Sequence, residues 1–274
     1  MEHKSVVIEH RKGWVGVDFK ELWKFRELLY FLAWRDIKVK YKQTALGVVW
    51  AVLQPVLAML VFSLVFGRFA SMPSEGVPYP VFVLTGLLLW NYFAAVLSQS
   101  TTSLVAGSNL VSKVYFPRLI IPASSAIAAL IDFLIGFAVL LVMMLWYGVG
   151  LGPGVLLAPV IVGVVLLNAV GFGIWLSALN VRYRDVQYAV PFLIQIWMFA
   201  SPVIYPASLL GEKWSWLLHL NPMSGVIEAI RPAMLGNKPI PWEGLAVSAA
   251  IGLAVFLAGV FYFRRVERYF ADVI

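Results

Sequence analysis

The sequence predicts an all-α integral membrane protein with six transmembrane helices, an amphipathic helix before the first span and re-entrant helices between spans five and six. Apolar side chains make up 61% of its 274 residues and charged ones 13%, which leaves too little polar surface for a water-soluble protein. The apolar residues form runs close to the roughly 20 residues with which a helix crosses a bilayer. Lys and Arg gather in alternate connections between these runs.

The cytoplasmic segment before the first span, residues 1–45, is expected to hold an interfacial helix. In the stretch 18–41, Phe19, Phe25 and Leu29 recur at helical spacing with basic residues between them. A basic amphipathic helix rich in aromatic residues lies in the plane of the membrane interface. A soluble helix packed on a partner is the alternative. No cleavable signal peptide is expected, because the one apolar stretch in this segment is short and is followed by charges.

Four apolar runs predict the first four spans, with cores at residues 46–66, 80–97, 127–147 and 155–179. The glycine-rich turn at 148–154 is too short to hold a domain. We therefore expect the third and fourth spans to form a helical hairpin.

The last two spans are unequal in length. Residues 189–205 form a short fifth run that ends in the breaker sequence SPVIYP. Residues 245–263 form the sixth run, which closes on the arginine-rich cytoplasmic tail 264–274. The transmembrane domain is therefore expected to cover residues 46–263.

The connection 206–243 is too apolar for a solvated loop and too interrupted for two full spans. It is predicted to contain re-entrant helices shielded by protein, and it is a candidate outer gate. Asn221 as a cap and Pro222 at the first helical position predict the start of one of these helices. Glu228 and Arg231, three residues apart on that helix, are expected to pair and mask both charges.

The distribution of basic residues predicts the orientation of the chain. Seventeen of the 21 Lys and Arg fall on one side of the six-span arrangement and four on the other. Because cytoplasmic connections carry the excess, both termini are expected in the cytoplasm. The same topology accounts for the net charge of +7, so no nucleic-acid partner is expected. The lack of cysteine excludes disulfides and thiolate metal sites.

Asp132 is the single charge within the predicted spans. A carboxylate inside the membrane is by default a candidate functional site. Asp132 lies near the cytoplasmic end of the third span, where it could instead pair with a basic residue of a neighbouring segment as a structural anchor. The anchor interpretation is favoured, and the functional one stays open.

No motif in the sequence indicates catalysis. A phosphate-binding loop, an HExxH zinc site and a GxSxG elbow are all absent, and the three histidines do not cluster. We therefore expect a transport permease, not an enzyme, with no cofactor or metal bound by this chain. Its compact cytoplasmic segments are suited to taking energy from a separate subunit.

Residues 107–118 are the clearest of these cytoplasmic segments. Lys113 and Arg118 flank the aromatic residues Tyr115 and Phe116. Exposed aromatics beside arginine are typical of interface hot spots, which predicts a docking segment. The alternative is that the two basic residues serve only as topology signals.

Four motifs occur in order along the chain: KVYFPRLIIPASSAIAALIDF from Lys113, NVRYRDV from Asn180, SPVIYP from Ser201 and NPMSGVIEAIR from Asn221. Together they resemble the type-2 ABC exporter permeases of cell-surface polysaccharides, from about Phe25 to the end of the chain. The resemblance implies a homodimer of six-span subunits docked on two copies of a separate ATPase chain, which holds ATP and Mg. The expected cargo is a lipid-linked polysaccharide crossing the bacterial inner membrane, with O antigen first and teichoic acid or capsule next.

The resemblance also implies roles for individual residues. ATPase coupling would involve Lys113, Val114, Tyr115, Phe116, Pro117 and Arg118, with Arg182, Arg184 and Asp185 close by. The gates would include Trp23, Phe25 and Trp34 on the cytoplasmic side and Ser201, Pro202, Tyr205, Asn221, Pro222, Glu228 and Arg231 on the outer side. Aromatic rings along the dimer path, on which sugars stack, would be Trp50, Phe62, Phe192, Trp197 and Phe199. Ordinary packing and lipid-interface belts are the alternative explanation for such aromatics.

Other transport and enzyme classes have less support. A drug or small-lipid exporter is the nearest alternative, because it differs in substrate and not in fold. A secondary transporter would show paired buried charges, and a membrane-embedded transferase would show an acidic or histidine cluster. The sequence offers neither.

Overall fold

The computed structural model describes residues 19–42 and 47–270, and in this part of the chain every regular element is a helix. The first half contains α1 (Phe19–Lys24), α2 (Arg26–Lys42), α3 (Gly47–Phe62), the π-helix η1 (Ser63–Phe69), α4 (Tyr79–Ala106), α5 (Ser108–Lys113) and α6 (Ile120–Trp146). The second half contains η2 (Pro153–Leu157), α7 (Ala158–Arg182), α8 (Val186–Ala200), η3 (Ala207–Leu210), α9 (Gly211–Leu220), α10 (Pro222–Leu235), α11 (Trp242–Val266) and η4 (Glu267–Tyr269). Residues 1–18 of the predicted amino-terminal segment and 271–274 of the tail lie outside the described residues.

Five helices are long and apolar enough to cross a membrane: Val49–Phe69, Tyr79–Ala106, Ile120–Trp146, Pro153–Arg182 and Trp242–Tyr269. They match the first, second, third, fourth and sixth predicted spans. The chain is therefore an all-helical, multi-pass membrane protein.

The fifth predicted span corresponds to a short helix. Helix α8 has 15 residues and ends at Ala200, where the breaker sequence SPVIYP begins. Ser201 adopts an extended backbone conformation (φ −103°, ψ 148°) and stands before Pro202. The proline ring disfavours helical geometry at the residue that precedes it, which explains why the helix stops there.

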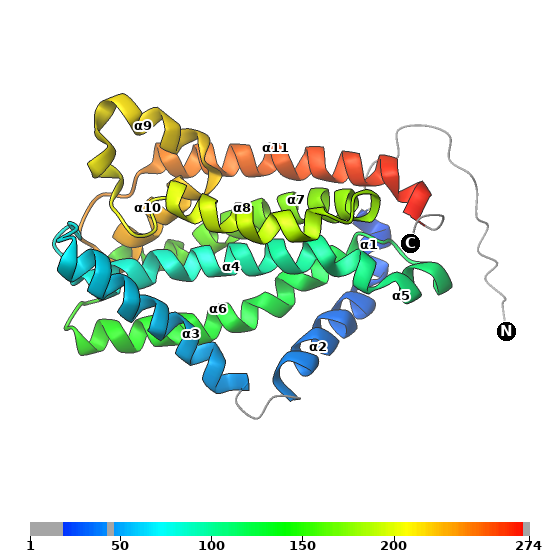
Figure 1. Ribbon diagram of the computed structural model, residues 1–274, viewed down its shortest axis with the longest axis horizontal. Coiled ribbons are helices and arrows are strands. Elements are labelled where there is room, and N and C mark those ends of the chain that lie inside the picture. Colours follow the sequence, from blue (N-terminus) through cyan, green and yellow to red (C-terminus); the bar gives the residue numbers. More distant parts are fainter. Residues whose placement is uncertain (1–18, 43–46, 271–274) are drawn as a thin grey trace.

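Helix α4 is the centre of the bundle. It packs against α3, α6, α7, α8 and α10, and 78% of its most apolar 18-residue window is buried. In Figure 1, α4, α6, α7 and α11 run along the long axis of the molecule, while α2 and α3 slant away from it. The corresponding window of the first span is only 6% buried, so most of α3 faces the surroundings.

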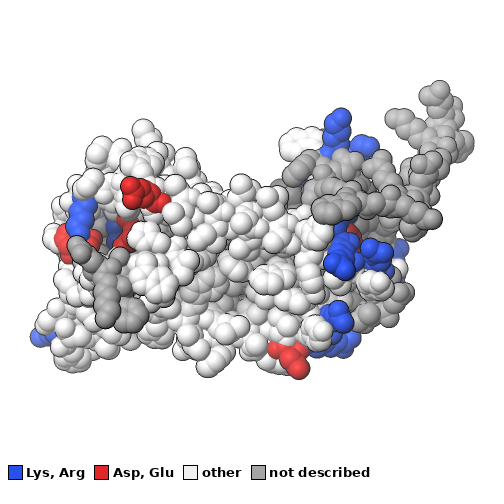
Figure 2. Space-filling model, turned by 90° about the horizontal axis from the view of Figure 1, so that it is seen from above, with Lys and Arg blue, Asp and Glu red and all other residues white. Residues whose placement is uncertain are grey.

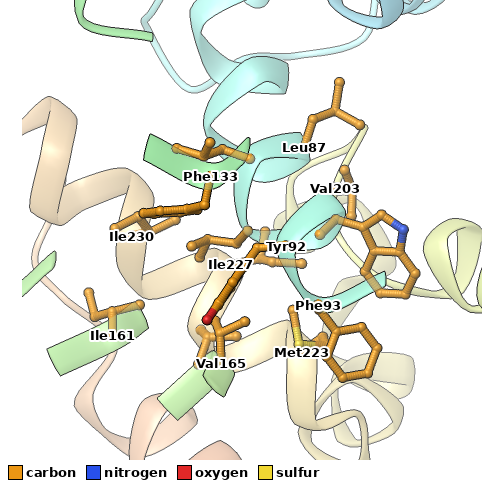
Figure 3. Close-up of a cluster of buried hydrophobic side chains, with 14 of the residues drawn as sticks. Leu87, Tyr92, Phe93, Phe133, Ile161, Val165, Val203, Met223, Ile227 and Ile230 are labelled. Carbon is orange, nitrogen blue, oxygen red and sulfur yellow. The ribbon is translucent and has the colours of Figure 1, made fainter. Parts of the chain in front are cut away.

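The core lies between α4 and the helices around it (Figure 3). The cluster includes Leu87, Tyr92 and Phe93 from α4, Phe133 from α6, Ile161 and Val165 from α7, Val203 from the turn after α8, and Met223, Ile227 and Ile230 from α10. All of these side chains are buried. Helix α10 is thus part of the core and not a surface loop.

Helix α10 also lies close against α11. Gly225 faces Gly244 so tightly that a Cβ atom added to Gly225 would stand 2.0 Å from the Gly244 carbonyl oxygen. A glycine is therefore required at this position on α10.

Candidate functional site

A groove of about 440 Å³ opens between α3 and α8, with α4 and α6 at its base. We call it the α3–α8 groove. Its walls are mostly apolar, but Gln54, Asn91, Ser98 and Asp132 add polar atoms, and Lys40 of α2 lies at its edge. A groove with an apolar frame and a few polar groups is typical of a binding surface.

Asp132 is held by two residues from the end of α2. Its carboxylate accepts a hydrogen bond from Lys40 Nζ at 2.5 Å and another from the Tyr41 hydroxyl. Burial and the hydrogen bond to Asp132 raise the pKa of the Tyr41 phenol, so that Tyr41 stays a proton donor. The structure supplies the neighbouring basic partner that the anchor interpretation of Asp132 requires.

The aromatic residues of α1 and α2 lie on two different faces of this segment, one exposed and one packed against the protein. Trp23 and Trp34 are exposed, and Lys38 lies 5.5 Å from the Trp34 ring centroid. Phe25 is half-buried and packs with Leu32 in the apolar cluster at this end of the bundle. One face of the segment is thus bound to the protein, and the other presents aromatic and basic side chains outward.

The aromatics expected along the transport path are not equivalent. Trp50 on α3 and Phe192 and Phe199 on α8 are exposed. Phe62 is half-buried and stacks on Phe66 at 5.9 Å between ring centroids. Trp197 is instead packed inside the subunit, edge to face with three other rings.

The rings around Trp197 form a compact cluster. Trp90, Phe93 and Phe172 contact it with centroid distances of 6.2, 5.1 and 5.2 Å. The indole Nε1 of Trp197 donates to Asn221 Oδ1 at 3.0 Å. Trp197 therefore holds α8 to α10, and a role for its ring along the transport path stays a prediction.

The segment after α5 divides into an exposed tip and a buried base. Lys113, Val114 and Tyr115 are exposed, and Tyr115 retains 72% of its accessible surface. Phe116 is only 5% exposed, so the expectation that both aromatics are exposed is wrong for Phe116. In the extended chain after Val114, neighbouring side chains point to opposite sides, and Phe116 is the one that faces the protein.

Arg118 belongs to the base and not to the tip. Its Nη1 donates to the Glu267 carbonyl at 2.5 Å, and its guanidinium lies 6.0 Å from the Phe270 ring centroid. Pro117 is buried beside it. The base therefore ties the start of α6 to the end of α11.

The residues around the α7–α8 connection lie at the same end of the molecule. Val181 shares an apolar cluster with Phe116, and the neighbouring Arg182, Arg184 and Asp185 are exposed. They thus follow a residue that packs in the same cluster as the segment after α5, and their part in ATPase coupling stays a prediction.

At the opposite end, Asn221 joins three elements. Its side chain accepts from the Met223 backbone N–H at 3.0 Å, which confirms it as the cap of α10. It also donates to Ser201 Oγ at 2.8 Å and accepts from Trp197. Pro222 stands at the first helical position, as expected. In the same turn Pro202 is buried, and Tyr205 donates to the Phe199 carbonyl at 3.2 Å.

The expected pair between Glu228 and Arg231 is wrong. Arg231 is 2% exposed, and its guanidinium lies 3.7 Å from the Phe82 ring centroid while Nη2 donates to the Val203 carbonyl at 2.7 Å. Three-residue spacing brings two side chains to one face of a helix, but the long arginine chain turns to the ring and the carbonyl instead.

Glu228 faces a pocket of about 250 Å³ that Arg231 also lines. Burial raises the pKa of the Glu228 carboxyl, and the positive charge of Arg231 opposes that shift. An ion pair that the sequence did not indicate lies in the same pocket, since Lys238 Nζ is 2.7 Å from Glu75 Oε1. It links the connection after η1 to the connection after α10. The sequence carries only a weak signal for it: both residues fall in connections at the outer end.

Comparison with known proteins adds to this geometry. The model of the ABC-2 type transporter family matches residues 27–235. The chain belongs to that family. The match begins in α2 and ends with α10, so it includes the segment after α5, the α3–α8 groove and the Asn221 junction of this ABC-2 transporter.

Relatives of this ABC-2 transporter match it over nearly their whole length. An O-antigen export system permease protein RfbA from Myxococcus xanthus is 31% identical over 258 residues, which cover 93% of this chain and 98% of the relative. An RfbA of the same description from Klebsiella pneumoniae is 27% identical over 90% of this chain and 95% of its own length. The polysialic acid transport protein KpsM from Escherichia coli is 26% identical over 85% of this ABC-2 transporter and 91% of its own length.

Proposed function

We propose that this chain is the membrane subunit of an ABC exporter that moves a lipid-linked polysaccharide, O antigen first, across the bacterial inner membrane. ATP would be hydrolysed, with Mg, in a separate ATPase subunit. The observation that carries the proposal is the similarity to O-antigen export permeases over 93% of the chain. The similarity to polysialic acid transport proteins favours a second cargo, another cell-surface polysaccharide.

The path of the chain supports six crossings. Helix α7 ends at Arg182, which shares a cavity with Arg265 near the end of α11. The start of α11 lies against α10, which in turn contacts η2 at the start of α7. The chain must therefore return along the bundle between α7 and α11, and α8 covers about 22 Å of that distance. Helix α8 is the fifth and shortest crossing, and α9 and α10 are re-entrant.

The charges support an orientation with both termini in the cytoplasm. Figure 2 shows Lys and Arg gathered at one end of the molecule, the end where Figure 1 shows α5 and the end of α11. A smaller cluster of both signs lies at the other end. Membrane proteins keep their Lys and Arg excess on the cytoplasmic side.

Two subunits would enclose the transport path at the exposed faces of α3 and α8. Trp50, Phe192 and Phe199 leave their rings exposed there, beside the polar atoms of the α3–α8 groove. Aromatic rings bind the CH faces of sugars while leaving hydroxyl groups in water, which suits a polymer that has to keep moving. A homodimer with this path between its subunits follows.

The ATPase would dock on the exposed tip formed by Lys113, Val114 and Tyr115. Exposed aromatic and basic side chains are common at interface hot spots. The buried base, Phe116 and Arg118, connects that tip to α6 and α11. ATP binding in the paired ATPase chains would thus move the tips, and the base would pass the movement into the bundle and part the two subunits.

Helix α2 would act as the cytoplasmic gate. Its Trp34 and basic side chains face outward, suited to the membrane interface, while Lys40 and Tyr41 fix its end to Asp132. On the outer side, α10 and its Asn221 junction would form the second gate.

The proposal is tested with the full chain and the ATPase encoded beside it. The two are copurified, reconstituted, and assayed for ATP hydrolysis with and without lipid-linked O antigen. We expect a stable complex whose hydrolysis rate changes with the polymer, and restored surface polysaccharide when the chain is returned to a deletion strain. Failure of the two chains to associate would reject the proposal.

A further inference from the structure

A second cavity lies at the basic end of the molecule, between the ends of α7 and α11. It has a volume of about 600 Å³ and is lined by Val181, Arg182, Tyr262, Arg265, Val266, Tyr269 and Phe270. This volume falls within the range of ~300–1,000 Å³ that is usual for ligand pockets. Of its lining residues, only Arg182 is among those that the resemblance sets close to the ATPase, and the proposed export cycle gives the cavity itself no role.

The two arginines that line the cavity are available to a ligand. In the described part of the chain, neither Arg182 nor Arg265 has an ion pair or a side-chain hydrogen bond, and the Arg182 guanidinium lies 5.3 Å from the Tyr183 ring centroid. No acidic residue lines the cavity. The nearby Glu267 carboxylate is occupied by Arg264 at 3.2 Å. Among the described residues, the cavity is therefore positively charged and has no counter-ion in its lining.

The lining of the cavity combines two arginine side chains with apolar and aromatic ones. Arg182 is the last residue of α7 and Arg265 stands near the end of α11, where the two spans leave the membrane. Tyr262 lies one helical turn before Arg265, on the same face and toward the membrane. Val181 and Tyr262 thus stand on the membrane side of the two arginines along their helices, and Val266, Tyr269 and Phe270 complete the lining. Such an arrangement fits a molecule with an anionic head and an apolar tail.

We infer that this cavity binds an anionic phospholipid of the surrounding bilayer. Its phosphate lies between Arg182 and Arg265, and its first acyl carbons lie against Val181 and Tyr262. Basic pockets between transmembrane helices on the cytoplasmic side bind lipid headgroups in this way. Of the proposed function, the inference uses only the orientation, which assigns the lipid to the inner leaflet.

The bound lipid would act on a contact that matters for coupling. Phe270 forms one wall of the cavity, and its other surroundings include the Arg118 guanidinium and the Phe263 ring. A lipid that fills the cavity therefore supports the base of the ATPase docking tip from the membrane side.

The experiment measures phosphatidylglycerol binding to the purified, delipidated full chain by native mass spectrometry during a lipid titration. An arginine near an anionic surface contributes about fivefold in affinity, so R182Q with R265Q should weaken the tightest phosphatidylglycerol site about 25-fold. R268Q is the matched control, because Arg268 lies on the same helix end but does not line the cavity. It should bind as the unchanged chain does. Val266→Phe fills the cavity without altering charge and should also abolish the tightest phosphatidylglycerol binding. It replaces the double variant in the test if that variant fails to fold.

Three results would overturn the inference. One is equal affinity for phosphatidylglycerol and phosphatidylcholine. Another is displacement of the lipid by millimolar inorganic phosphate, which would assign the site to a free anion. The third is unchanged lipid binding combined with lost ATPase copurification in R182Q with R265Q, which would make the arginines a protein-docking surface. Because ATPase copurification is read separately, loss of lipid binding with an intact complex supports the lipid site and leaves the export proposal untouched.

Discussion

The contact between α10 and α11 gives the sharpest test of the packing. In Gly225→Ala, the new Cβ would stand 2.0 Å from the Gly244 carbonyl oxygen and 2.4 Å from its carbonyl carbon. Ordinary contact needs about 3.5 Å, so the helices must separate by about 1.5 Å. The obstacle is backbone, which cannot rotate away as a side chain does. Overpacking of this kind costs about 1–3 kcal/mol, and we expect the upper part of that range.

The opposite glycine is the control. A Cβ on Gly244 would meet the Gly225 Cα at 3.5 Å, an ordinary contact. Since alanine is favoured over glycine in a helix by about 1 kcal/mol, Gly244→Ala should be neutral or stabilising. The assay is thermal unfolding of the purified chain in detergent. A cost of about 3 kcal/mol corresponds to a fall in melting temperature of about 6–12 °C for Gly225→Ala. Equal melting temperatures for the two variants would refute the reasoning.

Three further outcomes are expected. Tyr115→Ala should reduce ATPase copurification without changing the melting temperature, whereas Phe116→Ala should lose about 3–5 kcal/mol of stability because its ring is buried; loss of copurification without destabilisation in Phe116→Ala would contradict the division into tip and base. Asp132→Ala removes the carboxylate that accepts hydrogen bonds from Lys40 and Tyr41 and should cost about 1–3 kcal/mol, measured by thermal unfolding, while an unchanged melting temperature would reject the anchor. Arg231→Ala removes a buried cation–ring contact and a hydrogen bond, for an expected loss of about 3 kcal/mol, and full stability would show that the guanidinium is not structural.

The positions of the spans could be predicted from the sequence, because a span is recognised by the length and apolar character of a continuous run of residues. The runs at 80–97, 155–179 and 245–263 lie wholly within long helices of the structure, and the runs at 46–66 and 127–147 overlap such helices over nearly all of their described residues. The cap at Asn221 was also predictable, since a side-chain oxygen at that position satisfies a free backbone N–H of the helix start.

The contact partners of individual side chains could not be predicted from the sequence, because they depend on which helices pack against each other. Arg231 lies three residues after Glu228, yet its partners are Phe82 on α4 and the Val203 carbonyl after α8. The spacing of residues within one helix does not predict these contacts with other parts of the chain. Phe116 and Tyr115 are likewise adjacent aromatics, and only the apolar cluster around α6 and α11 decides which one is buried.

The unequal burial of α3 and α4 has a consequence for how the chain is made. Helix α3 leaves the ribosome before α4 and is apolar enough to partition into lipid by itself. The hydroxyls of Thr85 and Thr101 bond to carbonyls of α4 itself, so α4 can also enter lipid early. Its contacts, however, come mainly from α6 and α7, with smaller shares from α3, α8 and α10. All of these partners except α3 are synthesised later.

Insertion and assembly of α4 are therefore separated in time, as expected when helices enter the membrane individually and associate afterwards. A nascent chain that ends before α10 would contain an inserted α4 whose contact surface for α10 is still exposed to lipid. Substitutions in α10 should consequently reduce the amount of protein that reaches the membrane in folded form, even where the spans themselves insert normally.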